Sequence, residues 1–155
     1  MTVSTPTVKY EKRNQIAYIT LNRPEAINAL NREIRGGLQE ALQDFRDDPE
    51  ILVGIMTGEG GRAFSAGMDL KERASLDSKG ESRNEGGAAR GSFIDLGVYK
   101  PIIAAIDGYC VAGGLELSLQ CDIRIATAKS EFGLPEPRWS ILAGYGLHNL
   151  SRMIP

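Results

Sequence analysis

Short apolar runs alternate along this chain with segments of helical periodicity, and this alternation limits the folds that it can adopt. Apolar residues that form a continuous run, or that alternate with polar ones, predict four strands over 15–21, 51–57, 101–107 and 122–126. Helices are predicted over 30–45, 113–120 and 147–153, with a short extended piece over 131–134. Strands that alternate with helices pair mostly in parallel, so the pattern predicts an α/β fold.

Two local features add to this outline. Asn28 stands just before the helix over 30–45 and is expected to cap it. Residues 71–91 are charged and rich in glycine and serine, which predicts a mobile surface loop. The chain, 1–155, is 42% hydrophobic and 25% charged, which is typical of a single globular domain.

Composition excludes several kinds of chemistry. With 18 basic and 20 acidic residues the net charge is −2, which argues against nucleic acid as a partner. His148 is the only histidine, and Cys110 and Cys121, expected to be buried free thiols, are too few for a transition-metal site. The sequence has no apparent secretory signal, membrane-spanning run, phosphate-binding loop or dinucleotide-binding motif, so a cytoplasmic protein is expected. The chemistry must use carboxylates, backbone groups or an external cofactor.

A turn of small residues follows a short strand in the segment A-F-S-A-G-M-D-L, residues 63–70. Asp69 is placed to cap the helix that follows. The backbone N–H groups near Met68 then have no intrahelical partner, which suits them to bind an oxyanion. Taken alone, such a turn is usually only a connection between a strand and a helix.

A second strand runs into a glycine-rich turn in the segment D-G-Y-C-V-A-G-G-L-E-L, residues 107–117. Gly113 and Gly114 let a ligand approach the backbone closely. Glu116 lies in the first turn of the following helix, where the helix dipole favours the ionised carboxylate and apolar neighbours favour the neutral acid. Taken alone, Glu116 would only complement the helix dipole.

A second carboxylate, Glu136, stands between Pro135 and Pro137, whose fixed φ angles hold its backbone rigid. Taken alone, a carboxylate on a stiff turn is usually a surface residue. Proton transfer without histidine needs two carboxylates, one as base and one as acid. Glu116 and Glu136 are the candidate pair.

Taken together, these segments resemble the successive motifs of the enoyl-CoA hydratase/isomerase superfamily. The resemblance rests on I-T-L-N-R-P-E-A-I-N-A-L at 19–30, S-A-G-M-D-L at 65–70, I-I-A-A-I-D-G-Y-C-V-A-G-G-L-E-L at 102–117, C-D-I-R-I-A at 121–126 and F-G-L-P-E at 132–136. It implies a crotonase-like (ClpP/crotonase) α/β fold, a spiral of repeated β-β-α units. It also implies that the single domain 1–155 lacks the family's C-terminal helical part.

The resemblance further implies a role for each matching residue. The N–H groups of Met68 and Gly113 would form an oxyanion hole for the carbonyl oxygen of an acyl-CoA thioester. Glu116 would act as the base toward a water at Cβ of a 2-enoyl-CoA, and Glu136 would donate the proton to Cα. CoA is part of the substrate, and no cofactor or metal is implied. The expected substrate-binding residues are Ala26, Ala66, Asp69, Leu70 and Gly114.

Two other functions stay open from the sequence: a double-bond isomerase that uses one glutamate, and a non-catalytic acyl-CoA-binding subunit. The presence of both glutamates favours the hydratase. The resemblance also implies a homotrimer or hexamer. Trp139 and Tyr145 depart from the family pattern beside the acyl pocket, and their simplest interpretations are a core residue and a surface residue, respectively. His148 is expected to be a surface or packing residue of its helix rather than a catalyst.

Overall fold

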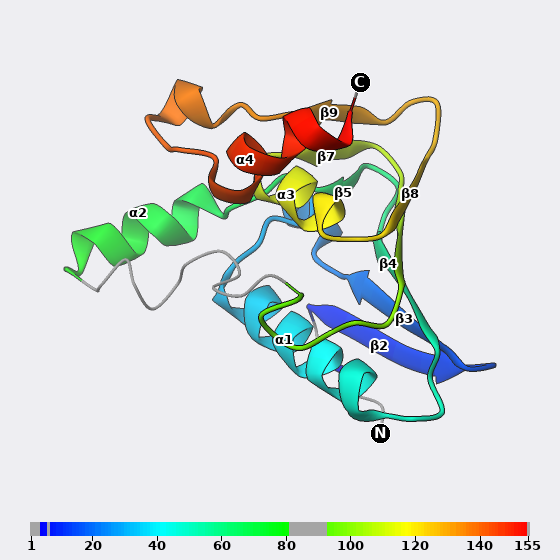
Figure 1. Ribbon diagram of the computed structural model, residues 1–155. Helices are drawn as coiled ribbons and strands as arrows, with labels where there is room; N and C mark the ends of the chain where they lie inside the picture. Colours follow the sequence, from blue (N-terminus) through cyan, green and yellow to red (C-terminus); the bar gives the residue numbers. More distant parts are fainter. Residues whose placement is uncertain (1–3, 6, 81–92, 155) are drawn as a thin grey trace.

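Six strands form the larger of the two sheets in this protein. The structure, a computed structural model, describes residues 4–5, 7–80 and 93–154 (Figure 1). The sheet has the order β1-β2-β3-β4-β6-β8, with the bounds β1 Ser4–Thr5, β2 Val8–Arg13, β3 Ile16–Leu21, β4 Val53–Gly58, β6 Ile102–Ile106 and β8 Ile123–Ala126. From β3 to β8 all neighbours pair in parallel, which confirms the predicted α/β fold.

One edge of this sheet is an antiparallel hairpin that the sequence pattern did not predict. β2 pairs with β3, with Arg13 opposite Ile16. The two residues between them, Asn14 and Gln15, have φ angles of 51° and 65°, as the favoured two-residue hairpin turns require. β2 was overlooked because charged residues occupy its outward positions, which hides the burial of Tyr10 on the inner face.

Three short strands form a second sheet with parallel pairing in the order β5-β7-β9. Their bounds are β5 Ala63–Ser65, β7 Tyr109–Val111 and β9 Glu131–Gly133. Along the chain, β4 is followed by β5 and α2 (Leu70–Ser78), and β6 by β7 and α3 (Gly113–Leu119). After β8 and β9 come the 3₁₀ helix η2 (Glu136–Trp139) and α4 (Gly144–Met153). Because β5 and β7 are parallel neighbours, the turns that lead into α2 and α3 meet at one edge.

The longest helix, α1 (Arg32–Asp47), lies along β2 and β3 (Figure 1). It follows the short 3₁₀ helix η1 (Pro24–Ala26). Full burial of one large apolar side chain stabilises a fold by about 1.5–3 kcal/mol, so the apolar stripe of α1 anchors the helix strongly. The stripe consists of Ile34, Leu38, Ala41, Leu42 and Phe45, all buried.

The predicted cap of this helix was wrong. Asn31, not Asn28, is the N-cap residue, and its side chain accepts a hydrogen bond from the Ile34 N–H at 2.9 Å. Asn28 instead lies fully buried three residues earlier, with a φ of 51°. Asparagine suits both positions, since its short polar side chain tolerates positive φ as well as capping helices.

The mobile loop predicted over 71–91 was also wrong in its first part. Residues Leu70–Ser78 form α2, which extends away from the two sheets (Figure 1). None of its residues is buried, so it has no apolar stripe that a periodicity argument could detect. Residues 81–91 of the predicted loop lie outside the described residues.

Both cysteines are buried free thiols, as predicted. Burial raises the pKa of Cys110 to about 11 and that of Cys121 to about 12, so neither supplies a thiolate nucleophile near neutral pH. Among the helices of the described residues, none combines the length and the apolar character that crossing a membrane requires.

Candidate active site

The two backbone N–H groups proposed as oxyanion donors lie at the meeting point of the β5 and β7 turns. A Cβ atom placed on Gly67 would be 2.8 Å from the Gly113 nitrogen, and one placed on Gly113 would be 3.8 Å from the Met68 nitrogen. Gly67 itself has a φ of +83°, which brings its backbone against the second turn without a side chain in between. The structure therefore brings Met68 and Gly113 together, and their role as oxyanion donors stays a prediction.

Neither of these N–H groups donates a hydrogen bond to another group within the described part of the chain. Gly113 is the first residue of α3, so its N–H has no intrahelical acceptor. The residues on either side of Met68 do bond to Leu30. The Gly67 carbonyl accepts from the Leu30 N–H at 2.7 Å, and the Asp69 N–H donates to the Leu30 carbonyl. Two adjacent donors without protein acceptors suit a carbonyl oxygen that gains negative charge.

Asp69 caps α2, as predicted. Its Oδ1 accepts from the N–H groups of Lys71 and Glu72, each at 3.1 Å, and its Oδ2 accepts from Arg23 Nη1 at 2.9 Å. Burial alone would raise the pKa of Asp69, but the Glu72 N–H and the Arg23 guanidinium outweigh it and hold the pKa below 3.8. In this structure the side chain of Asp69 is committed to fixing the start of the helix.

The other expected substrate-binding residues lie around the same turns. Ala66 follows β5, and its N–H donates to the Ile27 carbonyl at 3.0 Å, which ties the turn to the segment after η1. Ala26 ends η1, and Leu70 begins α2 with its side chain exposed. Gly114 is buried beside β5. Ala66, Leu70 and Gly114 lie within two residues of a donor, and Ala26 precedes the residue bonded to Ala66. Contact of all four with a substrate stays a prediction.

Glu116 lies in the first turn of α3 and is partly buried. Its Oε1 accepts a hydrogen bond from the Gly146 N–H at 2.8 Å. Gly146 is in the first turn of α4, and the N-cap residue of that helix, Ala143, makes no side-chain hydrogen bond to it. The Glu116 carboxylate therefore accepts from one of the N–H groups that lack an intrahelical partner. A negative charge is favoured at such a position by the helix dipole.

Glu136 has a different environment. It is the first residue of η2, its side chain is buried, and Oε2 has no hydrogen-bond partner among the described residues. Burial raises the pKa of Glu136 above 4.5, and the negative charge of Glu116 raises it further. The two glutamates therefore differ in their surroundings: Glu136 is buried with a raised pKa, whereas Glu116 has a backbone donor at the start of α4.

The two aromatic departures have the reverse of their expected environments. Trp139 was interpreted as a core residue but is 62% exposed, because it lies at the outer end of η2. Tyr145 was interpreted as a surface residue but is partly buried and packs against the hydrophobic core from the first turn of α4.

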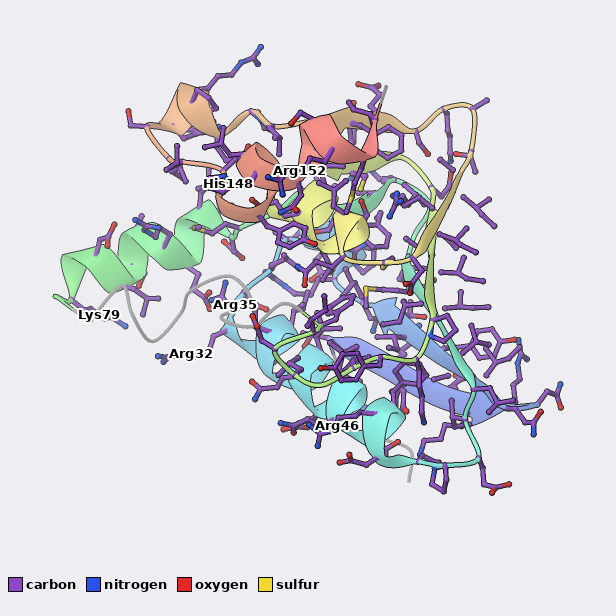
Figure 2. All side chains as sticks on the ribbon, viewed as in Figure 1. Arg32, Arg35, Arg46, Lys79, His148 and Arg152 are labelled. Atoms are coloured by element: carbon purple, nitrogen blue, oxygen red, sulfur yellow. The ribbon has the colours of Figure 1, made fainter. Side chains whose placement is uncertain are left out.

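His148 is exposed on α4, as expected. The basic side chains labelled in Figure 2 lie on separate elements: Arg32, Arg35 and Arg46 on α1, Lys79 just after α2, and His148 and Arg152 on α4. Two of the arginines are paired with carboxylates, Arg35 with Glu72 and Arg46 with Asp47. In the described ranges no three histidine, cysteine, aspartate or glutamate side chains gather as metal ligands would.

Three residues of the site escaped the sequence analysis. The Gly146 N–H binds Glu116 from thirty positions further along the chain, and only the glycine-rich sequence that opens α4, residues 144–146, hinted at it. Asn28 and Ser65 are buried polar residues beneath the first turn. Both lie inside the motifs at 19–30 and 65–70, and that position is the only sign in the sequence of a role for them.

Comparison with protein families gives a match over 11–155 to the family described as enoyl-CoA hydratase/isomerase. Among curated proteins, the (E)-benzylidenesuccinyl-CoA hydratase of Thauera aromatica is 43% identical over 155 residues, covering 96% of this chain and 58% of the relative. The short-chain-enoyl-CoA hydratase of Clostridium acetobutylicum is 37% identical over 146 residues, covering 93% of this chain and 56% of that protein. The chain thus spans less than two thirds of the length of these relatives.

Solved structures of the same kind of enzyme match in three dimensions. An enoyl-CoA hydratase from Bacillus anthracis superposes with a TM-score of 0.85 at 33% identity, covering 96% of this chain and 58% of that one. An enoyl-CoA hydratase from Mycobacterium tuberculosis superposes with a TM-score of 0.82 at 41% identity, covering 97% of this chain and 58% of that one. Sequence and backbone therefore agree over almost the whole of this chain.

Proposed function

The chain belongs to the enoyl-CoA hydratase/isomerase family and has its crotonase-like fold of β-β-α units, and from that premise we propose that it carries the catalytic site of a hydratase. The reaction is the addition of water across the 2,3 double bond of a 2-enoyl-CoA thioester. The product is a 3-hydroxyacyl-CoA. CoA enters as part of the substrate, and no separate cofactor takes part.

The Met68 and Gly113 N–H groups bind the thioester carbonyl oxygen in this mechanism. When water adds at Cβ, the electron pair of the double bond moves toward Cα and the carbonyl, and negative charge develops on that oxygen. Two fixed donors stabilise this enolate-like state more than the neutral substrate. Their position at adjacent turns and their lack of protein acceptors support this role.

The unequal environments of the two glutamates are the observation that carries the proposal. Glu116 accepts a backbone hydrogen bond at a helix N-terminus, so it is the base that takes a proton from the attacking water. Glu136 is buried with an unpartnered oxygen and a raised pKa, so it is the acid that gives its proton to Cα. One proton is taken and one is given, and exchange with solvent restores both glutamates.

A one-base isomerase would use these residues differently. Shifting a double bond requires a single group that removes a proton from one carbon and returns it to another, so only one of the two glutamates would be essential. A non-catalytic acyl-CoA-binding subunit would need neither. The distinct environments of Glu116 and Glu136 favour the reaction that uses an acid and a base.

The test follows the loss of conjugated-thioester absorbance when the chain is mixed with 2-butenoyl-CoA. We expect Glu116→Gln and Glu136→Gln each to lower kcat, because general acid or base catalysis is worth on the order of 10²–10⁴-fold. Glu40→Gln, the same change at an exposed position on α1, is the matched control and should leave kcat unchanged.

Two results would contradict the hydratase. If the folded chain leaves the absorbance of both short and long 2-enoyl-CoA substrates unchanged, it does not hydrate them. If Glu136→Gln keeps full activity, or if the chain instead converts 3-hexenoyl-CoA to its conjugated isomer with only Glu116 required, the isomerase takes its place.

Two finer features belong to the same proposal. The CoA moiety passes over the turns that hold Ala26, Ala66, Asp69, Leu70 and Gly114, supported by the backbone bond that joins the turn after β5 to the segment after η1. The protein self-associates as a trimer or a pair of trimers. The exposed edge strand β8 supports this, because Ile123 and Ile125 are 53% and 61% exposed there. Light scattering on the purified chain would measure the oligomer mass.

A further inference from the structure

Ser65 occupies the junction of the two turns that carry the proposed oxyanion donors. It is the last residue of β5 and is fully buried. On one side its Oγ accepts a hydrogen bond from the Gly67 N–H at 3.2 Å, one peptide before the Met68 N–H. On the other side its backbone lies against Gly114, where an added Cβ would come within 2.3 Å of the Ser65 carbonyl oxygen. Ser65 therefore touches the neighbours of both donors.

The Ser65 hydroxyl is itself fixed by a donor–acceptor chain. It donates to the Asn28 carbonyl oxygen at 2.8 Å while it accepts from Gly67 N–H. A hydroxyl that both donates and accepts has a defined orientation, because rotation would break a hydrogen bond without forming a new one. The position of Gly67 is thus linked to the position of Asn28 through a single oxygen atom.

Asn28 is anchored in turn by its own side chain, which is fully buried. Its Oδ1 accepts from the Arg23 N–H at 2.9 Å, and its Nδ2 donates to the carbonyls of Glu59 at 3.0 Å and Ala63 at 2.8 Å. Both amide hydrogens are used. These bonds tie together the segment after β3, the end of β4 and the start of β5. These bonds fix the position of the Asn28 backbone carbonyl relative to β4 and β5.

From this geometry we infer that Ser65, held by Asn28, is a positioning residue that sets the direction of the Met68 N–H for the developing oxyanion. The inference rests on the proposed function, because it assigns a role in the same site. Ser65 has no contact with the reacting atoms in this assignment and acts through Gly67, the residue before Met68. Its bonds join the donor turn to Asn28, in addition to the bonds that the Gly67 carbonyl and the Asp69 N–H make with Leu30.

The inference makes Ser65→Ala more harmful to the transition state than to substrate binding. The variant leaves the Gly67 N–H and the Asn28 carbonyl without their partner, so that only the bonds of the Gly67 carbonyl and the Asp69 N–H to Leu30 still hold the direction of the Met68 N–H. A displacement of about 1 Å in a catalytic group typically costs about 10²-fold in rate, so we expect kcat to fall by about 10- to 100-fold. KM should change by no more than about twofold, because ground-state contacts with CoA do not involve Ser65.

Ser118→Ala is the matched control. Ser118 is also fully buried, and its Oγ donates at 2.8 Å to the Leu115 carbonyl within α3, without a bond to either turn. The two variants lose the same atom from equally buried positions. A loss of stability alone would affect both, whereas a positioning role affects only Ser65→Ala. Ser65→Cys retains a weak donor and acceptor and should give intermediate values.

The experiment measures the absorption maximum of cinnamoyl-CoA bound to each purified variant, together with kcat, KM and the melting temperature. Polarisation of the thioester carbonyl by two donors shifts the absorption of the conjugated probe to longer wavelength. We expect the full red shift in the unsubstituted chain and in Ser118→Ala, a partial shift in Ser65→Cys and the smallest in Ser65→Ala. A full shift and unchanged kcat in both Ser65 variants would overturn the inference and leave the hydratase standing. An unsubstituted chain that binds the probe without any shift would overturn the oxyanion hole and this inference with it.

Discussion

Replacement of Gly114 by alanine tests whether the close contact between α3 and β5 controls both stability and catalysis. A Cβ at this position would lie 2.3 Å from the Ser65 carbonyl oxygen and 2.8 Å from the Ser65 Cβ. A carbon and a carbonyl oxygen normally keep about 3.3 Å between them, so the start of α3 must move away from β5 by about 1 Å. The obstacle is backbone, which cannot turn aside as a flexible side chain would.

Both consequences can be estimated from this displacement. Forcing an extra carbon into a well-packed interior costs about 1–3 kcal/mol. For a chain of 155 residues this corresponds to a fall in Tm of about 3–10 °C. The movement also separates the Gly113 N–H from the Met68 N–H. Because a misplacement of about 1 Å costs on the order of 10²-fold, kcat should fall by about that factor.

Gly36→Ala is the same substitution at another position, and there we expect the melting temperature to rise rather than fall. Gly36 lies within α1, and a Cβ there would meet nothing within 4 Å. Alanine in a helix interior is about 0.5–1 kcal/mol more favourable than glycine, so Tm should rise by about 1–4 °C with kcat unchanged. Thermal unfolding and hydration kinetics on the three proteins make the comparison. If Gly114→Ala matches the unsubstituted chain in Tm and kcat, the reasoning from close contact is refuted.

Three further predictions concern capping and pH. Asn31→Ala should lower the free energy of unfolding by about 1 kcal/mol in urea titrations through loss of the α1 cap, while Asn31→Ser should retain most of it. Asp69 has a folded pKa below 3.8, so its contribution is present above that pH and is lost as pH falls through the folded value. The destabilisation by Asp69→Asn should therefore shrink in acid, and a constant difference across pH would contradict the role of the Arg23 ion pair. Glu136 has the opposite sign: its folded pKa lies above 4.5, so its contribution is fully present below 4.5 and is lost as pH rises through the folded value. Unfolding measured against pH should show Glu136→Gln gaining stability relative to the unsubstituted chain as pH rises, and a difference that moves the other way would exclude a raised pKa.

The strands and turns of the site were predictable because they depend on local composition. A buried parallel strand needs a continuous apolar run, and residues 101–107 contain such a run. The glycine-rich ends of such runs then mark the turns. The pairing of Met68 with Gly113 came from the resemblance to the enoyl-CoA hydratase/isomerase superfamily, and in the structure the two turns follow neighbouring strands of one parallel sheet.

Elements held by something other than an apolar face were not predictable in this way. α2 buries none of its residues, and its first turn is fixed by Asp69 and by Glu72, whose carboxylate accepts from Arg32 N–H and Arg35. Its composition is therefore that of a loop. The partner of Glu116 was hidden for a different reason. A hydrogen bond to the Gly146 N–H has no side-chain signature at position 146, because every residue except proline has a backbone N–H.

That one backbone bond gives two like residues different environments. Two carboxylates that share a buried site cannot both ionise without repulsion, so any asymmetry between them decides which one keeps the proton. The Gly146 N–H and the α4 dipole stabilise a charge on Glu116, whereas Glu136 has a buried oxygen without a donor among the described residues. A buried polar atom left unpaired costs stability, and its cost is lowest when the carboxyl is neutral. The same feature that weakens the fold at Glu136 thus raises the pKa of this carboxyl, as the proposed proton donor requires, and moving the backbone donor from Glu116 to Glu136 would remove that difference between the two glutamates.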